Sequence, residues 1–353
     1  MQVLLATAIL PRESIMSGNG LVTLVAKVQC VGGQLLEFPI TSSTTCGEVI
    51  AQIKGKLKLE NCANGFGLFE GCGQVHKCLM DKHFVSDVLS KWEVHEAPGI
   101  NPDGGNWQLI FKLFAFRDPL SPQLSVVEQK FIYEQAFESV MNRKFPADDE
   151  TLEKLLALRM QYVVGDHEEG DHEEGACISD VVKVHPEQRP RELTKTGPTK
   201  TGLLSRLKRT SRRKKGPTDE DVVKIKQRIV MQWQQLNGMS VDDARIAHME
   251  IIHSWNGCGA NLFDVECVQT KNGWPKELWL AVSLDGIGIF PRNERESLVY
   301  HSYESVLSFG APAANKYKIV VDNAGPMLFE ANMVLEIGTL MKEYIKAFGT
   351  RNQ

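Results

Sequence analysis

Several features that identify enzymes, zinc proteins and membrane proteins are missing from this chain of 353 residues. Its eight cysteines include no C-x-x-C pair, so neither a zinc site nor a redox dithiol is indicated. No apolar run approaches the roughly 18 residues that a membrane-spanning helix needs. The motifs G-x-S-x-G, G-x-x-x-x-G-K-[ST] and H-E-x-x-H are also absent. These absences predict a protein that is not an enzyme and that holds no cofactor and no metal.

Charge and the distribution of thiols narrow the class of protein further. Lys and Arg number 40 against 44 Asp and Glu, a net charge of −4, so no nucleic-acid partner is expected from bulk electrostatics. Scattered single thiols suit a reducing cytoplasm. The apolar stretch Val3–Leu10 has no basic flank and runs into Pro11, which argues against a signal peptide. We interpret residues 1–20 as the remnant of an upstream segment.

The last ninety or so residues predict a sheet closed by one helix. Seven short runs rich in Val, Ile, Leu and Phe are bounded by Gly, Asn, Asp or Pro, as is typical of strands. They cover residues 262–268, 277–283, 286–290, 297–302, 305–310, 317–322 and 327–331. The period then becomes helical, with Met333, Ile337, Leu340, Met341, Tyr344 and Phe348 on one face. Residues 259–349 are therefore predicted to form a β-sandwich of the pleckstrin-homology or phosphotyrosine-binding type with a C-terminal helix.

Two further lobes are predicted before it, in an α+β chain. Residues 21–116 read as a hairpin around Gly32 and Gly33, a helix begun by a capping box at Thr45 and Glu48, and more strands, the order of a ubiquitin-like lobe. Residues 117–255 take helical spacing and contain helix starts at Asp148 and Ser240. This second lobe includes a basic insertion, predicted to be flexible, at 165–218.

The insertion holds two unusual segments. Gly165–Glu169 is repeated unchanged as Gly170–Glu174, and the identity of the copies favours a duplicated surface loop over a metal site. Residues 195–215 carry nine Lys or Arg and no acid. This basic arm fits anionic membrane, nuclear import, nucleic acid or a solvated loop, and Leu203, Leu204 and Leu207 favour the membrane. The candidate membrane-binding residues are Arg206, Lys208, Arg209, Arg212, Arg213, Lys214 and Lys215.

A binding site is also predicted in the third lobe. In such a sandwich the strand next to the closing helix keeps an unpaired edge, to which a peptide can add itself as a further strand. Counting along the chain places this edge at Ser305, Val306, Leu307, Ser308 and Phe309. We expect a peptide-binding groove there.

The order of the three lobes resembles a FERM domain, with a ubiquitin-like α/β lobe, a four-helix acyl-CoA-binding-protein-like lobe and a pleckstrin-like lobe. The resemblance extends from about Leu21 to Phe348. Among FERM domains, the chain most resembles the tail FERM domain of a filopodial, myosin-X-like unconventional myosin. The stretches that carry the resemblance are Phe131–Ala136, Leu156–Tyr162, Leu262–Cys267, Pro275–Leu280 and Leu307–Pro312.

The resemblance implies a cytoskeletal and membrane adaptor. Its expected partners are the cytoplasmic tails of adhesion or guidance receptors, held by the third lobe, with anionic phospholipid, microtubules or a myosin motor region as further partners. The expected location is the cytoplasm, associated with the cytoskeleton, at the plasma membrane or in filopodia. The repeat at 165–174 is not part of the family pattern, and the chain contains no motor.

Overall fold

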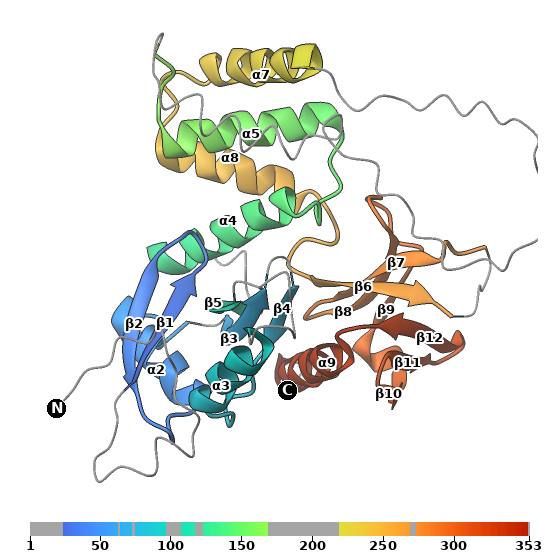
Figure 1. The fold of residues 1–353 in the computed structure, drawn as a ribbon. Coiled ribbons are helices and arrows are strands. Elements are labelled where there is room, and N and C mark those ends of the chain that lie inside the picture. Colours follow the sequence, from blue (N-terminus) through green and yellow to red (C-terminus); the bar gives the residue numbers. More distant parts are fainter. Residues whose placement is uncertain are drawn as a thin grey trace, which may run out of the picture. The chain divides into compact units, whose positions relative to one another are not determined.

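The computed structural model describes residues 24–62, 64–72, 75–96, 107–116, 123–168, 219–268 and 273–351. The chain divides into two compact units. Unit 2 comprises residues 139–254, and unit 1 comprises the segments before and after it. Helices and strands are both abundant (Figure 1), which confirms the predicted α+β class.

A five-stranded sheet forms the first part of unit 1. Its strands lie in the order β2-β1-β5-β3-β4, with β1 antiparallel to β2 and parallel to β5. The strands are β1 (Leu24–Cys30), β2 (Leu35–Ile40), β3 (Gly65–Cys72), β4 (Val75–Cys78) and β5 (Trp107–Ala115). Gly32 and Gly33 both take positive φ in the β1–β2 turn, a conformation that glycine adopts without strain. A hairpin followed by a helix and further strands is the order predicted for the ubiquitin-like lobe.

Two helices accompany this sheet, and the first begins where its capping box predicts. In α2 (Cys46–Leu57) the Thr45 hydroxyl accepts from the Glu48 N–H at 3.2 Å, and the Glu48 carboxylate accepts from the Thr45 N–H at 2.7 Å. Val49 and Ile53 of α2 are fully buried. The second helix, α3 (Val85–Glu96), is longer than the short helical turn that its sequence suggested.

Helix α4 (Val126–Met141) runs across the boundary between the units, which falls after Glu138. Unit 2 contains α5 (Asp149–Val163), α7 (Asp219–Gln234) and α8 (Val241–His253), and α5 contacts both of the others (Figure 1). The Asp148 side chain caps α5 by accepting from the Thr151 N–H, and Ser240 caps α8 by accepting from the Asp243 N–H. Both predicted helix starts are confirmed.

The seven predicted C-terminal strands form one continuous ladder. Its order is β10-β11-β12-β6-β7-β8-β9, with every neighbouring pair antiparallel. The strands are β6 (Asn261–Cys267), β7 (Glu277–Val282), β8 (Gly286–Pro291), β9 (Val299–Ser302), β10 (Val306–Ala313), β11 (Lys316–Val321) and β12 (Gly325–Ala331). Because β6 pairs with both β7 and β12, the ladder ends at β9 on one side and at β10 on the other.

Helix α9 (Val334–Arg351) closes this sheet. Ile337, Leu340, Met341 and Tyr344 are fully buried against the core of the sheet, as their spacing predicted. The core also includes Ala115, the last residue of β5. The first sheet and the C-terminal sheet of unit 1 are therefore joined by packing as well as by the chain.

Hydrogen bonds reinforce that junction. The Tyr344 hydroxyl accepts from the Phe116 N–H at 2.9 Å and from the Asn261 side-chain amide at 3.2 Å. The same amide donates to the Phe114 carbonyl at 3.2 Å. Four groups, from the end of β5, from β6 and from α9, are thus connected by three part-buried hydrogen bonds.

Candidate functional site

The predicted peptide-binding stretch lies at an edge of the C-terminal sheet. Val306–Phe309 belong to β10, which pairs with β11 on one side and has no described strand on the other. Ser305 instead ends a short 3₁₀ helix, Tyr303–Ser305, because its hydroxyl donates back to the Ser302 carbonyl at 2.7 Å. The Ser305 carbonyl accepts from the Asp322 N–H at 2.8 Å, so this carbonyl is already used.

The free edge of β10 is short. Its pairing with β11 shifts register between Val306 and Ser308 and again between Gly310 and Ala313. Pro312 lies in the second irregular part and has no N–H to donate. A peptide added to this edge can therefore follow regular backbone only as far as about Ala311.

One flank of α9 lies toward this part of the sheet. A side chain at Gly338 would begin 3.6 Å from the hydroxyl of Tyr317, a residue of β11, and α9 contacts β10 as well (Figure 1). Successive helical residues are about 100° apart, so Leu335, Lys342 and Ile345 share this flank with Gly338. We call Val306–Ala311 together with these four residues of α9 the β10–α9 edge.

Two leucines make the β10–α9 edge apolar at its surface. The side chain of Leu307 is 65% exposed and that of Leu335 is 63% exposed. Phe309 and Ile345 are half-buried and pack against the core. Exposed leucines on β10 and on α9, beside a strand edge with free backbone groups, suit an extended peptide that brings apolar side chains of its own.

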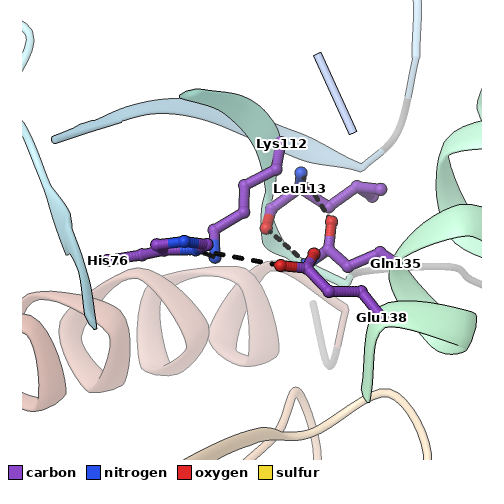
Figure 2. A network of polar contacts seen from close by, with 5 residues as sticks. All are labelled: His76, Lys112, Leu113, Gln135 and Glu138. Atoms are coloured by element: carbon purple, nitrogen blue, oxygen red, sulfur yellow. Dashed lines mark hydrogen bonds and ion pairs between the residues drawn. The ribbon is translucent and has the colours of Figure 1, made fainter. Parts of the chain in front are cut away.

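A second group of polar residues lies between the first sheet and α4 (Figure 2). The Lys112 ammonium of β5 is 2.9 Å from His76 Nδ1 of β4, and a Glu138 oxygen of α4 is 4.0 Å from the same nitrogen. Because an ammonium only donates, Nδ1 of His76 is the acceptor in its contact with Lys112. The ammonium also lies 4.6 Å from the centre of the Phe69 ring.

Burial lowers the pKa of Lys112, against the attraction of Glu138 and Cys78, which raises it. The Lys112 ammonium contacts the His76 imidazole and the Phe69 ring, both of which belong to this chain. We therefore assign this cluster to holding α4 on the sheet rather than to chemistry.

The neighbouring Gln135 serves the same purpose by a different contact. Its carboxamide accepts from the Leu113 N–H at 3.1 Å and donates to the Leu113 carbonyl at 3.0 Å (Figure 2). The pairing of β1 with β5 ends at the hydrogen bond that the Val31 N–H donates to the Phe111 carbonyl. Alternate residues of a strand direct their backbone groups to the same side, so Gln135 occupies the next place in the ladder where β1 has ended.

The first copy of the five-residue repeat is described through Glu168 and is held in unit 2. Asp166 accepts from the Gln161 amide at 2.7 Å and from the Gly238 N–H at 2.8 Å. These hydrogen bonds hold the pKa of Asp166 below its usual value. The Trp233 indole donates to the Gly165 carbonyl at 2.8 Å. The first copy thus joins α5 to the turn after α7, and the second copy lies outside the described residues.

Two of the remaining sequence predictions concern residues outside the described part of the chain. The seven basic residues from Arg206 to Lys215 and the N-terminal segment 1–20 also lie outside the described residues. Within the described part, no three His, Cys, Asp or Glu side chains are arranged to hold a metal ion. No helix there combines the length and the apolar character that crossing a membrane requires.

Sequence reasoning did not single out Lys112 or Gln135. A signal for Lys112 existed, because it is the one charged residue in the apolar strand from Trp107 to Ala115. Gln135 carries no comparable signal, since a polar residue in an amphipathic helix is ordinarily solvated. Its role depends on where β1 ends beside β5.

Comparisons with known proteins agree with the lobes that the structure shows. Residues 22–115 match the family model of an RA like domain, and residues 120–263 match that of the FERM central domain. The mouse protein named pleckstrin homology domain-containing family H member 3 is 26% identical over 354 residues. The alignment covers 91% of this chain and 43% of the mouse protein, so the chain spans less than half the length of this relative.

Solved structures of the same fold include myosin tails. The MyTH4-FERM MF1 domain of Dictyostelium discoideum myosin VII, in a mutant form, matches with a TM-score of 0.72 and 19% identity. The match covers 94% of this chain and 59% of that one. The human myosin 7b C-terminal MyTH4-FERM domain, in complex with the harmonin-a PDZ3 domain, matches with a TM-score of 0.65 and 15% identity, over 92% and 60%. At these identities the likeness shows the fold alone, and the finer resemblance to a myosin-X-like tail is not confirmed.

Proposed function

Because the chain has the three-lobed fold of a FERM domain, we propose that it is a non-enzymatic adaptor that binds receptor cytoplasmic tails at the β10–α9 edge. The tails are those of adhesion or guidance receptors. The adaptor acts in the cytoplasm, associated with the cytoskeleton at the plasma membrane or in filopodia, by itself or as part of a myosin tail. Microtubules and a motor region are the further partners that a myosin tail would bring.

The observation that carries this proposal is the free side of β10. An edge strand offers N–H and C=O groups that pair readily with another extended chain. Here α9 borders the strand, and each of the two elements carries an exposed leucine, Leu307 on β10 and Leu335 on α9. Main-chain hydrogen bonds supply affinity in such additions, and side-chain contacts at alternate positions supply specificity.

A comparison supports the general class of this function. The human myosin 7b MyTH4-FERM domain is in complex with a PDZ domain in its solved structure. A fold of this kind therefore accommodates a protein partner in at least that protein. The identity of the partner and of the contacting surface does not transfer at this sequence identity.

Labelled receptor-tail peptides and fluorescence anisotropy test the proposal. Leu335→Glu places a charge in the middle of the apolar edge, and we expect it to weaken binding by about tenfold or more. The matched control is Leu298→Glu, at a half-exposed leucine before β9, the opposite edge of the sheet. Equal loss in both variants, or no loss in Leu335→Glu, would contradict binding at the β10–α9 edge.

The basic arm supports a second candidate function, docking to phosphoinositide-containing membrane. Each basic residue near an anionic surface contributes on the order of 1 kcal/mol of attraction, and residues 195–215 hold nine without an acid. Changing Arg212, Arg213, Lys214 and Lys215 to Glu should abolish sedimentation with liposomes that contain phosphoinositide. Binding that survives this change and resists salt would rule out the arm as the membrane site.

A further inference from the structure

We propose that the peptide taken by the β10–α9 edge is acidic, with carboxylates alternating with apolar side chains over a strand of about five residues. This inference rests on the proposed function, because it names the ligand class of the same site. It comes from the charges beside the edge, from the alternation of side chains in β11 and from the position of Pro312.

The edge strand itself carries no charge. From Ser305 to Asn315 the sequence contains no Asp, Glu, Lys, Arg or His. Glu304 and Asp322 lie at the Ser305 end of this strand, where the Asp322 N–H donates to the Ser305 carbonyl. From Ser308 to Ala311 the nearest charges on its neighbours are lysines, with Lys318 of β11 directly opposite Gly310 and Lys342 on the flank of α9. Both are exposed, and neither has an ion-pair partner among the described residues. Lys316 differs, because it lies opposite Glu330 of β12.

The two lysines lie on different sides of a strand added to β10. Tyr317 and Ile319 of β11 are buried toward α9, so Lys318 between them projects from the opposite, solvent-facing side of the sheet. Lys342 belongs to the α9 side, beside Leu335 and Ile345. Side chains of an added strand alternate between these two sides in the same way.

This alternation specifies the pattern of the ligand. Positions that face the outer side of the sheet approach Lys318 and are best filled by Asp or Glu. Positions that face α9 meet Leu335 and Ile345 over the space that Gly338 leaves, and they are best filled by apolar residues. A carboxylate at the end of this apolar row reaches Lys342, whereas a lysine or arginine there or opposite Lys318 meets a like charge.

Pro312 sets the length. Backbone pairing with an added strand cannot continue regularly past Ala311, because the β10–β11 ladder shifts between Gly310 and Ala313 and proline lacks the donor. The attraction is local, since the whole chain has a net charge of −4 and repels acidic peptides at long range. Binding should therefore weaken as added salt screens the two lysines.

Selection from a random library of 12-residue displayed peptides tests the ligand class without a known partner. The wild-type chain is the target, and the neutral double variant Leu307→Ala, Leu335→Ala is used for counter-selection. We expect the peptides recovered on wild type alone to be enriched in Asp and Glu and depleted in Lys and Arg. Edge-dependent peptides with no such bias, or with a basic bias, would overturn the acidic class while leaving the peptide-binding function intact.

Synthetic copies of the recovered peptides then test the two lysines. Lys318→Gln and Lys342→Gln should each weaken binding by about twofold to fivefold, with the loss reduced at high salt. Lys224→Gln, at an exposed lysine of α7, is the control and should leave affinity unchanged. Affinity that is insensitive to both edge lysines contradicts the inference. Recovery of no edge-dependent peptide contradicts both it and the proposed function.

Discussion

At the scale of single residues, His248 of α8 connects burial to pH. Its side chain is fully buried, and burial, with a smaller contribution from Arg159, lowers its pKa from 6.5 to about 3. A histidine whose pKa is lower in the folded state contributes stability above pH 6.5 that is lost as the pH falls. Below pH 6.5 the His248 side chain binds a proton in the unfolded chain, whereas in the folded chain it stays neutral until a much lower pH.

We therefore predict that wild type loses about 2 kcal/mol of unfolding free energy between pH 7.5 and pH 5 through this residue alone. The measurement is urea unfolding across that range, for wild type and for His248→Met. The substitution removes the titrating group, so the stability difference between the two proteins should shift in favour of the variant as the pH falls. Parallel pH profiles would show that His248 does not govern the loss.

At the scale of elements, Gln135 attaches α4 to β5, because its carboxamide makes the hydrogen bonds to Leu113 that a neighbouring strand would make. Replacing it by Met keeps the helix and its volume but leaves the Leu113 N–H and C=O without their partner. Each unsatisfied buried group costs about 1–3 kcal/mol, so we expect the two together to lower the unfolding free energy by about 2–6 kcal/mol.

Amide hydrogen exchange identifies the cause of that loss. Exchange at Leu113 should accelerate in Gln135→Met more than at other amides of β5. The control is Gln129→Met in the same helix, which removes one hydrogen bond to the Leu124 carbonyl and should cost about 1 kcal/mol. If the two variants lose equal stability, Gln135 does not complete the sheet.

At the scale of the whole molecule, Tyr344 links the two sheets of unit 1. Tyr344→Phe removes the acceptor of the Phe116 N–H and one acceptor of the Asn261 amide. We predict a loss of about 1–3 kcal/mol and faster exchange of the Phe116 amide. Tyr317→Phe is the matched control, because the Tyr317 hydroxyl donates to the Met341 sulfur at 3.4 Å, a weak acceptor.

This prediction separates a shared core from two independent sheets. Loss of protection confined to α9 and β6 in Tyr344→Phe would mean that the first sheet does not depend on the junction. Loss that extends into β5 supports one cooperative unit, which is consistent with the burial of Ala115 in the core of the C-terminal sheet.

Local chemistry explains which parts of the fold were predictable. The helix starts at Thr45, Asp148 and Ser240 rest on hydrogen bonds between residues three apart, so the sequence contains all that they need. The seven C-terminal strands follow from alternating apolar runs between turn residues, and the closing helix follows from its apolar face. Even the edge strand could be found by counting, apart from Ser305, which a local hydroxyl bond draws into a 3₁₀ turn.

Contacts between distant segments were beyond local reasoning. Gln135 matters because β1 ends beside β5, and the half-buried Lys112 of β5 is attracted by Glu138 of α4. Sequence separations of more than twenty residues connect these groups, and no spacing rule relates them. The same holds for the charges beside the β10–α9 edge, which come from β11 and α9.

The amino-acid sequence by itself determined most helices and strands of the described residues and their order, because propensity, capping and hydrophobic period act over a few residues. Tertiary structure alone decided which side chains of other elements lie beside the free strand. The pairing of β12 with β6 places β10 at the end of the ladder, and the closing helix then borders it. The proposed site, which combines a strand with one free side, two leucines and two lysines, requires that this long-range pairing has formed.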